Sequence, residues 1–396
     1  SGDPNFNGSS SAPTTHTVNK ANSATTIQTL MNPPVYGETL TMTATTTAVA
    51  PGAGIPAGTV NFRDGATAIA GCQAVAVNAA GSATCTTAVL PAGNNKVIRA
   101  DYSGDANFNL STGSSLQTIL KAALNVTASS HTVTYGDAVP AITPTYAGFV
   151  LGEGAGNLTP APTCSTTYTA TSGVAGSPYP TTCSGGVSNN YNFNYIGGQV
   201  LVNRKALTVT ADNKTRGYGV ANPALTATLS GFIAGDNAGN STTGSAALTT
   251  TATIASPVGS YPITVAIGSL ASANYSFGTF TNGTLTITSV TLSVTADNKS
   301  RVFGAPNPPF TFTVTGFTNG EGTSVLTGSP ILSTTATATS APGSYPITIL
   351  QNTLGNPNYN IAVFNGTLTV SQAATTTVIT NAAALAANAT PVGQAY

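Results

Sequence analysis

The stretch Leu-Thr-Val-Thr-Ala at residues 207–211 decides the fold, because it alternates apolar and polar side chains and recurs twice. Its two counterparts are residues 124–128 and 292–296. Alternation with a period of two residues predicts a β-strand with one buried and one solvated face. Glycine, asparagine, proline and aspartate interrupt the chain between such stretches, which is typical of turns between short strands. The sequence therefore predicts an all-β protein, with one helical turn at most, in residues 236–245.

Four landmarks follow each of these stretches in the same order. They are an aromatic-glycine pair, a Gly-Phe pair, a Tyr-Pro pair and an Asn-Tyr pair, and a glycine-led strand such as residues 283–287 closes each copy. The aromatic-glycine pairs are Tyr135-Gly136, Tyr218-Gly219 and Phe303-Gly304, and the Asn-Tyr pairs are Asn190-Tyr191, Asn274-Tyr275 and Asn358-Tyr359. So many landmarks in one order predict three copies of one module.

The first hundred residues form a different module, and both ends of the chain resemble parts of it. Residues 1–7 resemble residues 103–109, and residues 374–379 resemble residues 24–27. We therefore expect both termini to be strands of truncated modules within a longer parent protein. The predicted domains are residues 1–20 (C-terminal strands of a truncated module), 21–120 (a complete module of that type), 121–204, 205–289 and 290–371 (three repeats), and 372–396 (N-terminal strands of a truncated module).

Composition excludes several classes of function. Charged residues are only 6% of the chain, and 11 Lys and Arg residues balance 11 Asp and Glu residues. Nucleic acids and anionic membrane surfaces are bound through clustered basic residues, so neither is an expected partner. No apolar stretch approaches the roughly 20 residues of a membrane-spanning helix, so we expect no membrane insertion.

The motifs resemble two known families of bacterial repeat domain. Residues 21–120 resemble bacterial Ig-like domains through Tyr36-Gly37-Glu38, the stretch 58–65 and Tyr102-Ser103-Gly104-Asp105. Residues 121–371 resemble MBG domains of the YGX type through the landmarks above, with Phe303 replacing the usual tyrosine. The resemblance implies a tandem array of small β-sandwich modules and MBG-type modules, sandwich or β-grasp-like, that forms an elongated rod. It also implies a secreted, cell-surface, adhesin-like protein without a known ligand.

The four cysteines form two local pairs, Cys72 with Cys85 and Cys164 with Cys183. The first pair flanks the turn-like residues 78–81, which predicts a bond across an antiparallel hairpin. Free thiols and metal ligation are the alternatives, but neither pair has Cys-x-x-Cys spacing and no histidine lies near. We therefore predict two disulfides, which places the protein outside the cytosol.

We predict no catalytic residue, cofactor or metal site. The only imidazoles, His16 and His131, lie in polar surroundings, and the acids are spread among turns. Asp212-Asn213 and its counterpart Asp297-Asn298 are candidate calcium ligands, but Asx turns are the expected explanation. Tyr102 is a candidate corner tyrosine that ties a strand to the backbone.

The leading functional hypothesis is an extracellular structural or adhesive repeat protein, a semi-rigid stalk or fibre segment that assembles into filaments. Its expected partners are copies of itself or further repeats of the parent chain, with the truncated ends pairing by strand addition as a sharper version. The alternative is a carbohydrate- or mucin-binding module that uses surface glycans. Exposure of Tyr179 and Tyr191 would favour the alternative, whereas burial would favour the structural role.

Overall fold

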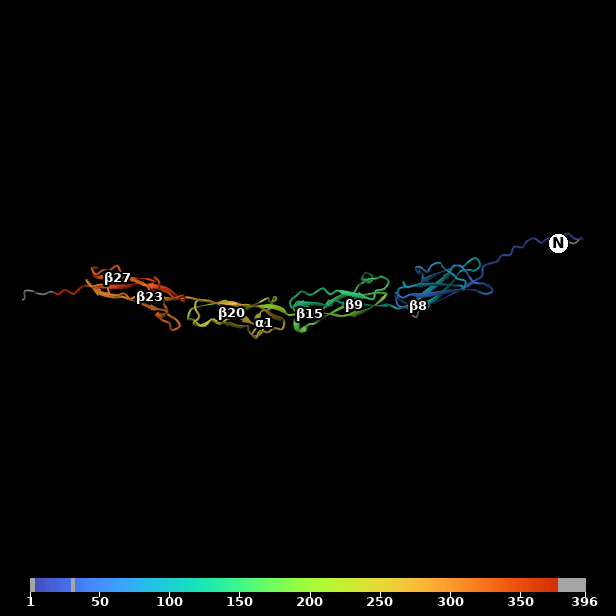
Figure 1. Ribbon diagram of the computed structural model, residues 1–396. Coiled ribbons are helices and arrows are strands. Elements are labelled where there is room, and N and C mark those ends of the chain that lie inside the picture. Colours follow the sequence, from blue (N-terminus) through green and yellow to red (C-terminus); the bar gives the residue numbers. More distant parts are fainter. Residues whose placement is uncertain (1–3, 30–32, 377–396) are drawn as a thin grey trace, which may run out of the picture. The chain divides into compact units, whose positions relative to one another are not determined.

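The computed structural model describes residues 4–29 and 33–376. Nearly all of its regular structure is β-strand (Figure 1), which confirms the predicted fold class. Helical structure in these residues is limited to α1 (Ala238–Ser241), inside the stretch where one turn was predicted, and three short 3-10 turns at Ala155–Asn157, Val174–Gly176 and Thr323–Val325. None of the described helices has the length and apolarity needed to cross a membrane. The chain forms two compact units, Ser1–Arg204 and Lys205–Tyr396.

The first module is a sandwich of two sheets with the strand orders β1-β2-β6 and β4-β3-β7-β8, with β5 also paired to β3. Its strands are β1 (Ser23–Thr29), β2 (Leu40–Ala48), β3 (Thr59–Asp64), β4 (Thr67–Ala68), β5 (Val75–Ala76), β6 (Ser82–Thr87), β7 (Gly93–Tyr102) and β8 (Ser111–Ile119). Side chains on β2 alternate between buried and half-buried, as its sequence pattern requires.

The strands expected near the N-terminus do not form. Residues 4–20 are exposed, contain no strand and make no β-bridge to any described strand. A β-strand needs a neighbour to satisfy its backbone N–H and C=O groups, so a fragment of a sandwich without its partner strands is not stable alone. Residues 372–376 are also exposed and without a strand, and the rest of the predicted C-terminal fragment lies outside the described residues.

The three repeats share one topology, in which a three-stranded sheet accompanies a four-stranded sheet. The orders are β11-β9-β14 with β10-β15-β13-β12, β18-β16-β21 with β17-β22-β20-β19, and β25-β23-β28 with β24-β29-β27-β26. Repeat 1 contains β9 (Ala122–Ala128), β10 (His131–Thr134), β11 (Pro144–Ala147), β12 (Thr163–Thr166), β13 (Tyr179–Ser184), β14 (Tyr191–Ile196) and β15 (Gly198–Asn203). Repeat 2 contains β16 (Lys205–Ala211), β17 (Lys214–Gly217), β18 (Ala227–Ser230), β19 (Ala247–Thr250), β20 (Gly259–Ala266), β21 (Tyr275–Thr281) and β22 (Gly283–Thr288). Repeat 3 contains β23 (Val290–Ala296), β24 (Lys299–Val302), β25 (Phe312–Thr315), β26 (Ile331–Ser333), β27 (Gly343–Leu350), β28 (Tyr359–Phe364) and β29 (Gly366–Ser371).

The closing strand of each repeat begins with glycine because the backbone passes very close to the end of the first strand. A Cβ atom at Gly283 would lie 2.5 Å from the carbonyl oxygen of Ala211, and one at Gly366 would lie 2.3 Å from that of Ala296. Any side chain would therefore collide with backbone that cannot move without breaking the sheet. This explains the glycine-led strand seen in the sequence.

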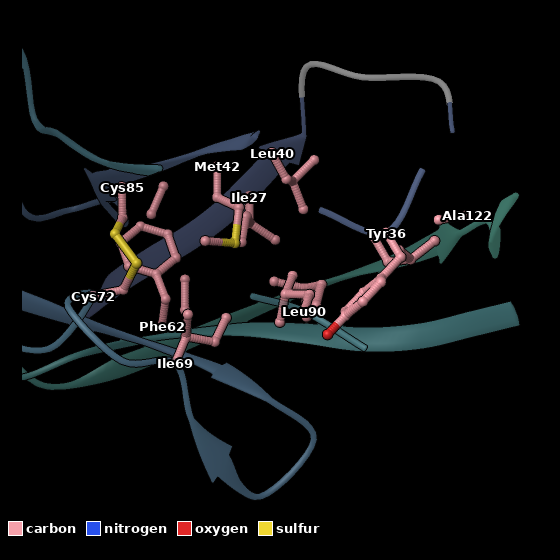
Figure 2. Packing of buried hydrophobic residues seen from close by; sticks show 14 of the residues in the cluster. Ile27, Tyr36, Leu40, Met42, Phe62, Ile69, Cys72, Cys85, Leu90 and Ala122 are labelled. Carbon is pink, nitrogen blue, oxygen red and sulfur yellow. A yellow bond between two sulfur atoms is a disulfide. The ribbon is translucent and has the colours of Figure 1, made fainter. Parts of the chain in front are cut away.

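The disulfide between Cys72 and Cys85 joins the two sheets of the first module, rather than two strands of one hairpin. Cys85 lies on β6, opposite Met42 of β2, whereas Cys72 lies in the turn between β4 and β5. The hairpin prediction fails because β5 pairs with β3 and not with β6. Figure 2 shows the bond beside Phe62 and Ile69, inside the buried apolar cluster.

The disulfide between Cys164 and Cys183 joins directly opposed residues of β12 and β13. At the corresponding positions, repeat 2 pairs Leu248 with Val265, and repeat 3 pairs Leu332 with Ile349. The covalent bond of repeat 1 thus replaces an apolar cross-strand pair that serves in the other two repeats.

Repeats 2 and 3 each bury an arginine whose guanidinium group donates hydrogen bonds to neutral oxygen atoms. Arg216 donates to Asn222 Oδ1 and to the carbonyl oxygens of Gly217 and Thr253. Arg301 repeats this arrangement with Asn307. Repeat 1 has a valine at the position of this arginine. In the same repeat a buried tyrosine, Tyr168, stands at the position that Ala252 has in repeat 2, and its hydroxyl donates to the carbonyl oxygen of Asp137.

Candidate interaction site at the module junctions

The Gly-Phe and Asn-Tyr landmarks of each repeat form one aromatic pair. In repeat 1 the ring of Phe149 lies edge-on to Tyr191, with 5.4 Å between ring centroids. The backbone N–H of Val150, next in the chain, donates to the Tyr191 hydroxyl oxygen at 3.1 Å. Tyr191 is only 2% exposed, so both its ring and its hydroxyl are held in one position.

A tyrosine from the first module completes this cluster inside the first unit. Tyr36 belongs to the aromatic-glycine turn of the first module, and its ring lies edge-on to Tyr191 at 5.6 Å. Figure 2 shows Tyr36 between Leu90 of its own module and Ala122, the first residue of β9. Buried apolar residues of both modules form one continuous cluster there. The first module and repeat 1 therefore share a core at their junction.

One carboxylate joins the two tyrosines. The hydroxyl of Tyr36 donates to Glu153 Oε1 at 2.8 Å, and that of Tyr191 donates to Glu153 Oε2 at 2.6 Å. Hydrogen bonds to an ionised carboxylate are shorter and stronger than those between neutral groups. We call this Tyr–Glu–Tyr arrangement, Tyr36–Glu153–Tyr191 with its counterpart below, the junction clasp.

Two further contacts hold the same junction. The N–H of Ala92 in the first module donates to Asn190 Oδ1 of repeat 1 at 3.1 Å. Gly37 lies so close to Val150 that a Cβ atom on the glycine would approach the valine side chain to 2.6 Å, and its φ of +90° also favours glycine. The aromatic-glycine landmark therefore provides the hydroxyl of the clasp and, next to it, a glycine without a side chain that allows the neighbouring module to approach closely.

The second unit repeats the clasp between repeats 2 and 3. Tyr218 donates to Glu321 Oε1 at 2.6 Å, and Tyr359 donates to Glu321 Oε2 at 2.5 Å. The two tyrosine rings are again edge-on at 5.6 Å. The N–H of Val258 donates to Asn358 Oδ1 at 2.9 Å, as Ala92 does to Asn190. Two different module types therefore use the same junction chemistry.

The carboxylates favour the neutral form of the clasp tyrosines. Burial, with the hydrogen bond to Glu153, raises the pKa of Tyr36 to about 12. Burial first and Glu153 second raise the pKa of Tyr191. The hydrogen bond to Glu321 is the larger cause, ahead of burial, that raises the pKa of Tyr218. All three hydroxyls remain donors across the physiological pH range, so the clasp stays closed there.

The landmark aromatics have mainly structural positions. Tyr135 and Tyr218 are buried, whereas Phe303 is 44% exposed. Tyr191 is buried, and Tyr179 is half-buried with its hydroxyl on the Gly173 carbonyl oxygen. This burial favours the structural hypothesis over sugar stacking on exposed tyrosines.

Several predicted polar roles change. Asp212 accepts the hydroxyls of Thr226, just before β18, and of Thr228, on β18, in place of an Asx turn. These two hydrogen bonds lower the pKa of Asp212. Its partner Asn213 accepts the N–H of Thr284, and Asp297 and Asn298 make the corresponding contacts in repeat 3.

The hydrogen-bond partners of Tyr102 and His131 were not predicted from the sequence. Tyr102 donates to the carboxylate of Asp105 at 3.0 Å, and not to backbone as a corner tyrosine does. His131 lies on β10 with its Nε2 atom 2.9 Å from the hydroxyl oxygen of Ser129, while His16 is exposed.

The two clasp glutamates were missed by sequence reasoning, which assigned the acids to turns. A signal was present, because Glu153 and Glu321 each stand four positions after the phenylalanine of a Gly-Phe landmark, and Asp236 does so in repeat 2. In repeat 2 the acid accepts the hydroxyl of Tyr275 at 2.6 Å. Recurrence of an acid at a fixed place in a chain with so few charges could have revealed it.

Models of two domain families match the chain. The one described as MBG domain (YGX type) matches residues 124–201, 207–286 and 292–369, which is more than half of the sequence. The one described as bacterial Ig-like domain (group 3) matches residues 27–120. None of the curated proteins matches the chain.

Solved structures similar to this chain include an adhesin, an outer capsid protein and a surface layer protein. The Escherichia coli adhesin FdeC is 16% identical, with 69% of this chain and 98% of that chain covered, at a TM-score of 0.22. Three N-terminal domains of the outer capsid protein Hoc of bacteriophage RB49 are 12% identical, with 67% and 98% covered, at a TM-score of 0.21. Domains 1–6 of the surface layer protein SbsC are 16% identical, with 89% and 55% covered, at a TM-score of 0.20. With TM-scores this low, these likenesses add nothing to the family matches.

Proposed function

Because this chain belongs to the MBG domain (YGX type) family, we propose that it is a structural spacer, a semi-rigid stalk or fibre segment. It is an extracellular or surface repeat protein, since its two disulfides require an oxidising compartment and its families are those of bacterial repeat domains. The proposed role is mechanical and not enzymatic: the modules keep the ends of the array apart.

The junction clasp is the observation that supports this role. Modules joined only by a short linker would pivot, because one backbone connection leaves several rotations free. The clasp adds a second attachment through Glu153, and the hydrogen bond from Ala92 to Asn190 adds a third in the first unit. Bending away from this arrangement must break the charge-assisted hydrogen bond from Tyr36 to Glu153, worth roughly 1.5–3 kcal/mol, and the neutral one from Ala92 to Asn190.

The clasp also explains why landmarks recur where no ligand is required. Tyr36 and Tyr218 come from different module types but occupy the same place against the next module. A joint that must resist bending constrains these positions as strictly as a binding site would. We therefore regard the aromatic-glycine, Gly-Phe and Asn-Tyr landmarks as parts of the joint.

Assembly into filaments is the finer part of the proposal. A chain with zero net charge and 6% charged residues has little electrostatic repulsion between copies and few charges to protect its sheet edges. Electron microscopy of concentrated protein tests this part. Filaments would support self-assembly, whereas dispersed single particles would restrict the proposal to a stalk.

Small-angle X-ray scattering of the full chain tests the spacer itself. We expect the double variant Glu153→Gln, Glu321→Gln to have a shorter maximum dimension and a broader distribution of shapes than the native chain. Far-UV circular dichroism must show that both proteins are folded. Identical scattering profiles would reject the joint as the source of stiffness.

Glycan binding is the alternative function, and the burial of the landmark tyrosines does not favour it. Sugars stack on exposed aromatic faces, whereas Tyr191, Tyr275 and Tyr359 are each at most 6% exposed. A glycan-array screen of the intact chain would revive this alternative if one sugar class bound specifically.

A further inference from the structure

The aromatic-glycine turn of repeat 3 has no clasp. Phe303 occupies the place of Tyr36 and Tyr218, but it is 44% exposed where those residues are 6% and 4% exposed. Its neighbour Val302 is 49% exposed. A Cβ atom on Gly304 would meet nothing within 4 Å, in contrast to Gly37 and Gly219. This end of repeat 3 is therefore an apolar joint surface that no described residue covers.

Phenylalanine cannot make the contact that a further MBG module requires. In repeats 1 and 3 the receiving end presents a glutamate, one oxygen of which accepts a hydroxyl from the preceding module, as Glu153 accepts Tyr36 and Glu321 accepts Tyr218. With phenylalanine at that place, the oxygen would sit in a half-buried joint without this donor. Loss of this hydrogen bond to a charged acceptor would lower the equilibrium constant for closing the joint roughly tenfold or more.

The Ig-like module has a receiving end that needs no hydroxyl. The N–H of Ala21 donates to the carbonyl oxygen of Asn107, just as the N–H of Ala122 donates to that of Asn190, so Asn107-Phe108 corresponds to Asn190-Tyr191. The aromatic residue there is Phe108, which carries no hydroxyl.

The acid at this end is already satisfied. Asp105 accepts the N–H groups of Asn107 and Phe108 on one oxygen, and the N–H of Ala57 and the hydroxyl of Tyr102 on the other. Within the Ig-like module its four contacts leave no need for a donor from a preceding module. An aromatic residue without a hydroxyl therefore suits this end better than tyrosine.

The same end is hollow. Residues 19–22 and 49–52 line a pocket of about 360 Å³ beside the start of β1. A cavity of about 150 Å³ can hold a benzene ring, so one phenyl side chain fits. The loop at 49–52 follows β2, as the loop that contains Val150 follows β11, so the pocket lies where an MBG module receives its neighbour.

From these observations we propose that the Phe303 end of repeat 3 is a docking surface for the receiving end of an Ig-like module. The hydroxyl, present on Tyr36 and Tyr218 and absent from Phe303, would thus set which type of module follows. The sequence after β29 agrees, because Ala374-Thr375-Thr376 matches Ala24-Thr25-Thr26. The inference rests on the proposed spacer function, since it assumes that neighbouring modules are held in fixed joints.

Hydroxyl-radical footprinting of extended chains tests the proposal. One chain continues after Ala373 with a copy of residues 24–120, an Ig-like module. The matched control continues after Gln372 with a copy of residues 290–371, an MBG module. We expect modification of Phe303 to fall severalfold with the Ig-like module and clearly less with the MBG module, relative to the original chain. The exposed Phe280 of repeat 2 serves as the internal reference.

The variant Phe303→Tyr should reverse this preference, with stronger protection of position 303 by the appended MBG module. Equal protection by both modules, or none by the Ig-like module, would overturn the proposal. Tyr36 and Tyr218 are measured in the same samples. If they were also freely modified, the spacer function itself would fail, whereas their protection with an exposed Phe303 would reject only the module preference.

Discussion

Replacing Glu153 by glutamine changes one atom and removes the charge that two tyrosine hydroxyls share. The carboxylate accepts Tyr36 at 2.8 Å and Tyr191 at 2.6 Å. A glutamine amide has one oxygen, so it can keep one of these acceptors and turns an N–H₂ group toward the other hydroxyl. Hydrogen bonds to charged groups contribute roughly 1.5–3 kcal/mol against about 1 kcal/mol for neutral ones. We expect a loss of about 2 kcal/mol at the junction.

Urea denaturation of the full chain provides the assay, combined with a double-mutant cycle. Tyr36→Phe removes one donor from the first module, and Glu153→Gln alters the acceptor in repeat 1. Because the two side chains are in contact, the cycle should give a coupling free energy of about 1 kcal/mol or more. Glu38→Gln is the matched control, since Glu38 is exposed and accepts the N–H of Val35, a neighbour in its own turn.

Additive effects of Tyr36→Phe and Glu153→Gln would refute the reasoning. So would a Glu153→Gln chain as stable as Glu38→Gln. Either result would mean that apolar packing and the hydrogen bond from Ala92 to Asn190 hold the two modules, and that the carboxylate is incidental.

Three further predictions concern Tyr36, the buried Arg216 and the Cys164–Cys183 disulfide. The pKa of Tyr36 is about 12 in the folded protein against an ordinary value of 10.0, so its contribution of about 2–3 kcal/mol to the free energy of unfolding is complete below pH 10 and is lost as the pH rises toward 12. In Tyr36→Phe the free energy of unfolding should therefore fall less steeply with pH above pH 10, and equal pH dependence in the two proteins would count against this. Arg216→Val should cost about 3 kcal/mol, because two buried carbonyl oxygens lose their donor, and adding Ala252→Tyr should restore part of it, as thermal melts can show. The pair Cys164→Leu, Cys183→Val copies the apolar pair of repeat 2 and should be more stable than the reduced native chain, while reduction of this bond should cost about 3 kcal/mol; a variant less stable than the reduced protein would contradict the equivalence of these pairs.

Strand positions were accessible from the sequence because they depend on local patterns. Alternation predicted β9, β16 and β23, and the chain's turn residues separated the strands as expected. The closing glycines were visible as landmarks, but their reason, contact with the carbonyl oxygens of Ala211 and Ala296, depends on how the chain crosses between sheets. No local pattern contains that information.

The junction clasp could not be predicted because its members are far apart in the sequence. Tyr36 and Glu153 belong to different modules, and each has a local explanation, as a core aromatic and as a turn acid. The Cys72–Cys85 bond shows the same limitation. Its pairing was predicted from the closeness of the two cysteines in the sequence, but the partner of β5 is β3, and only the sheet order reveals that the bond joins two sheets.

The angular freedom of the joint between the first module and repeat 1 tests the central claim most directly. Spin labels carried by non-natural residues at the exposed Ser114 and Thr145 would report the distance across this joint by pulsed electron resonance, without disturbing the disulfides. The account predicts one narrow distance distribution in the native chain and a broader one in Glu153→Gln. A broad native distribution, or one unchanged by Glu153→Gln, would contradict it.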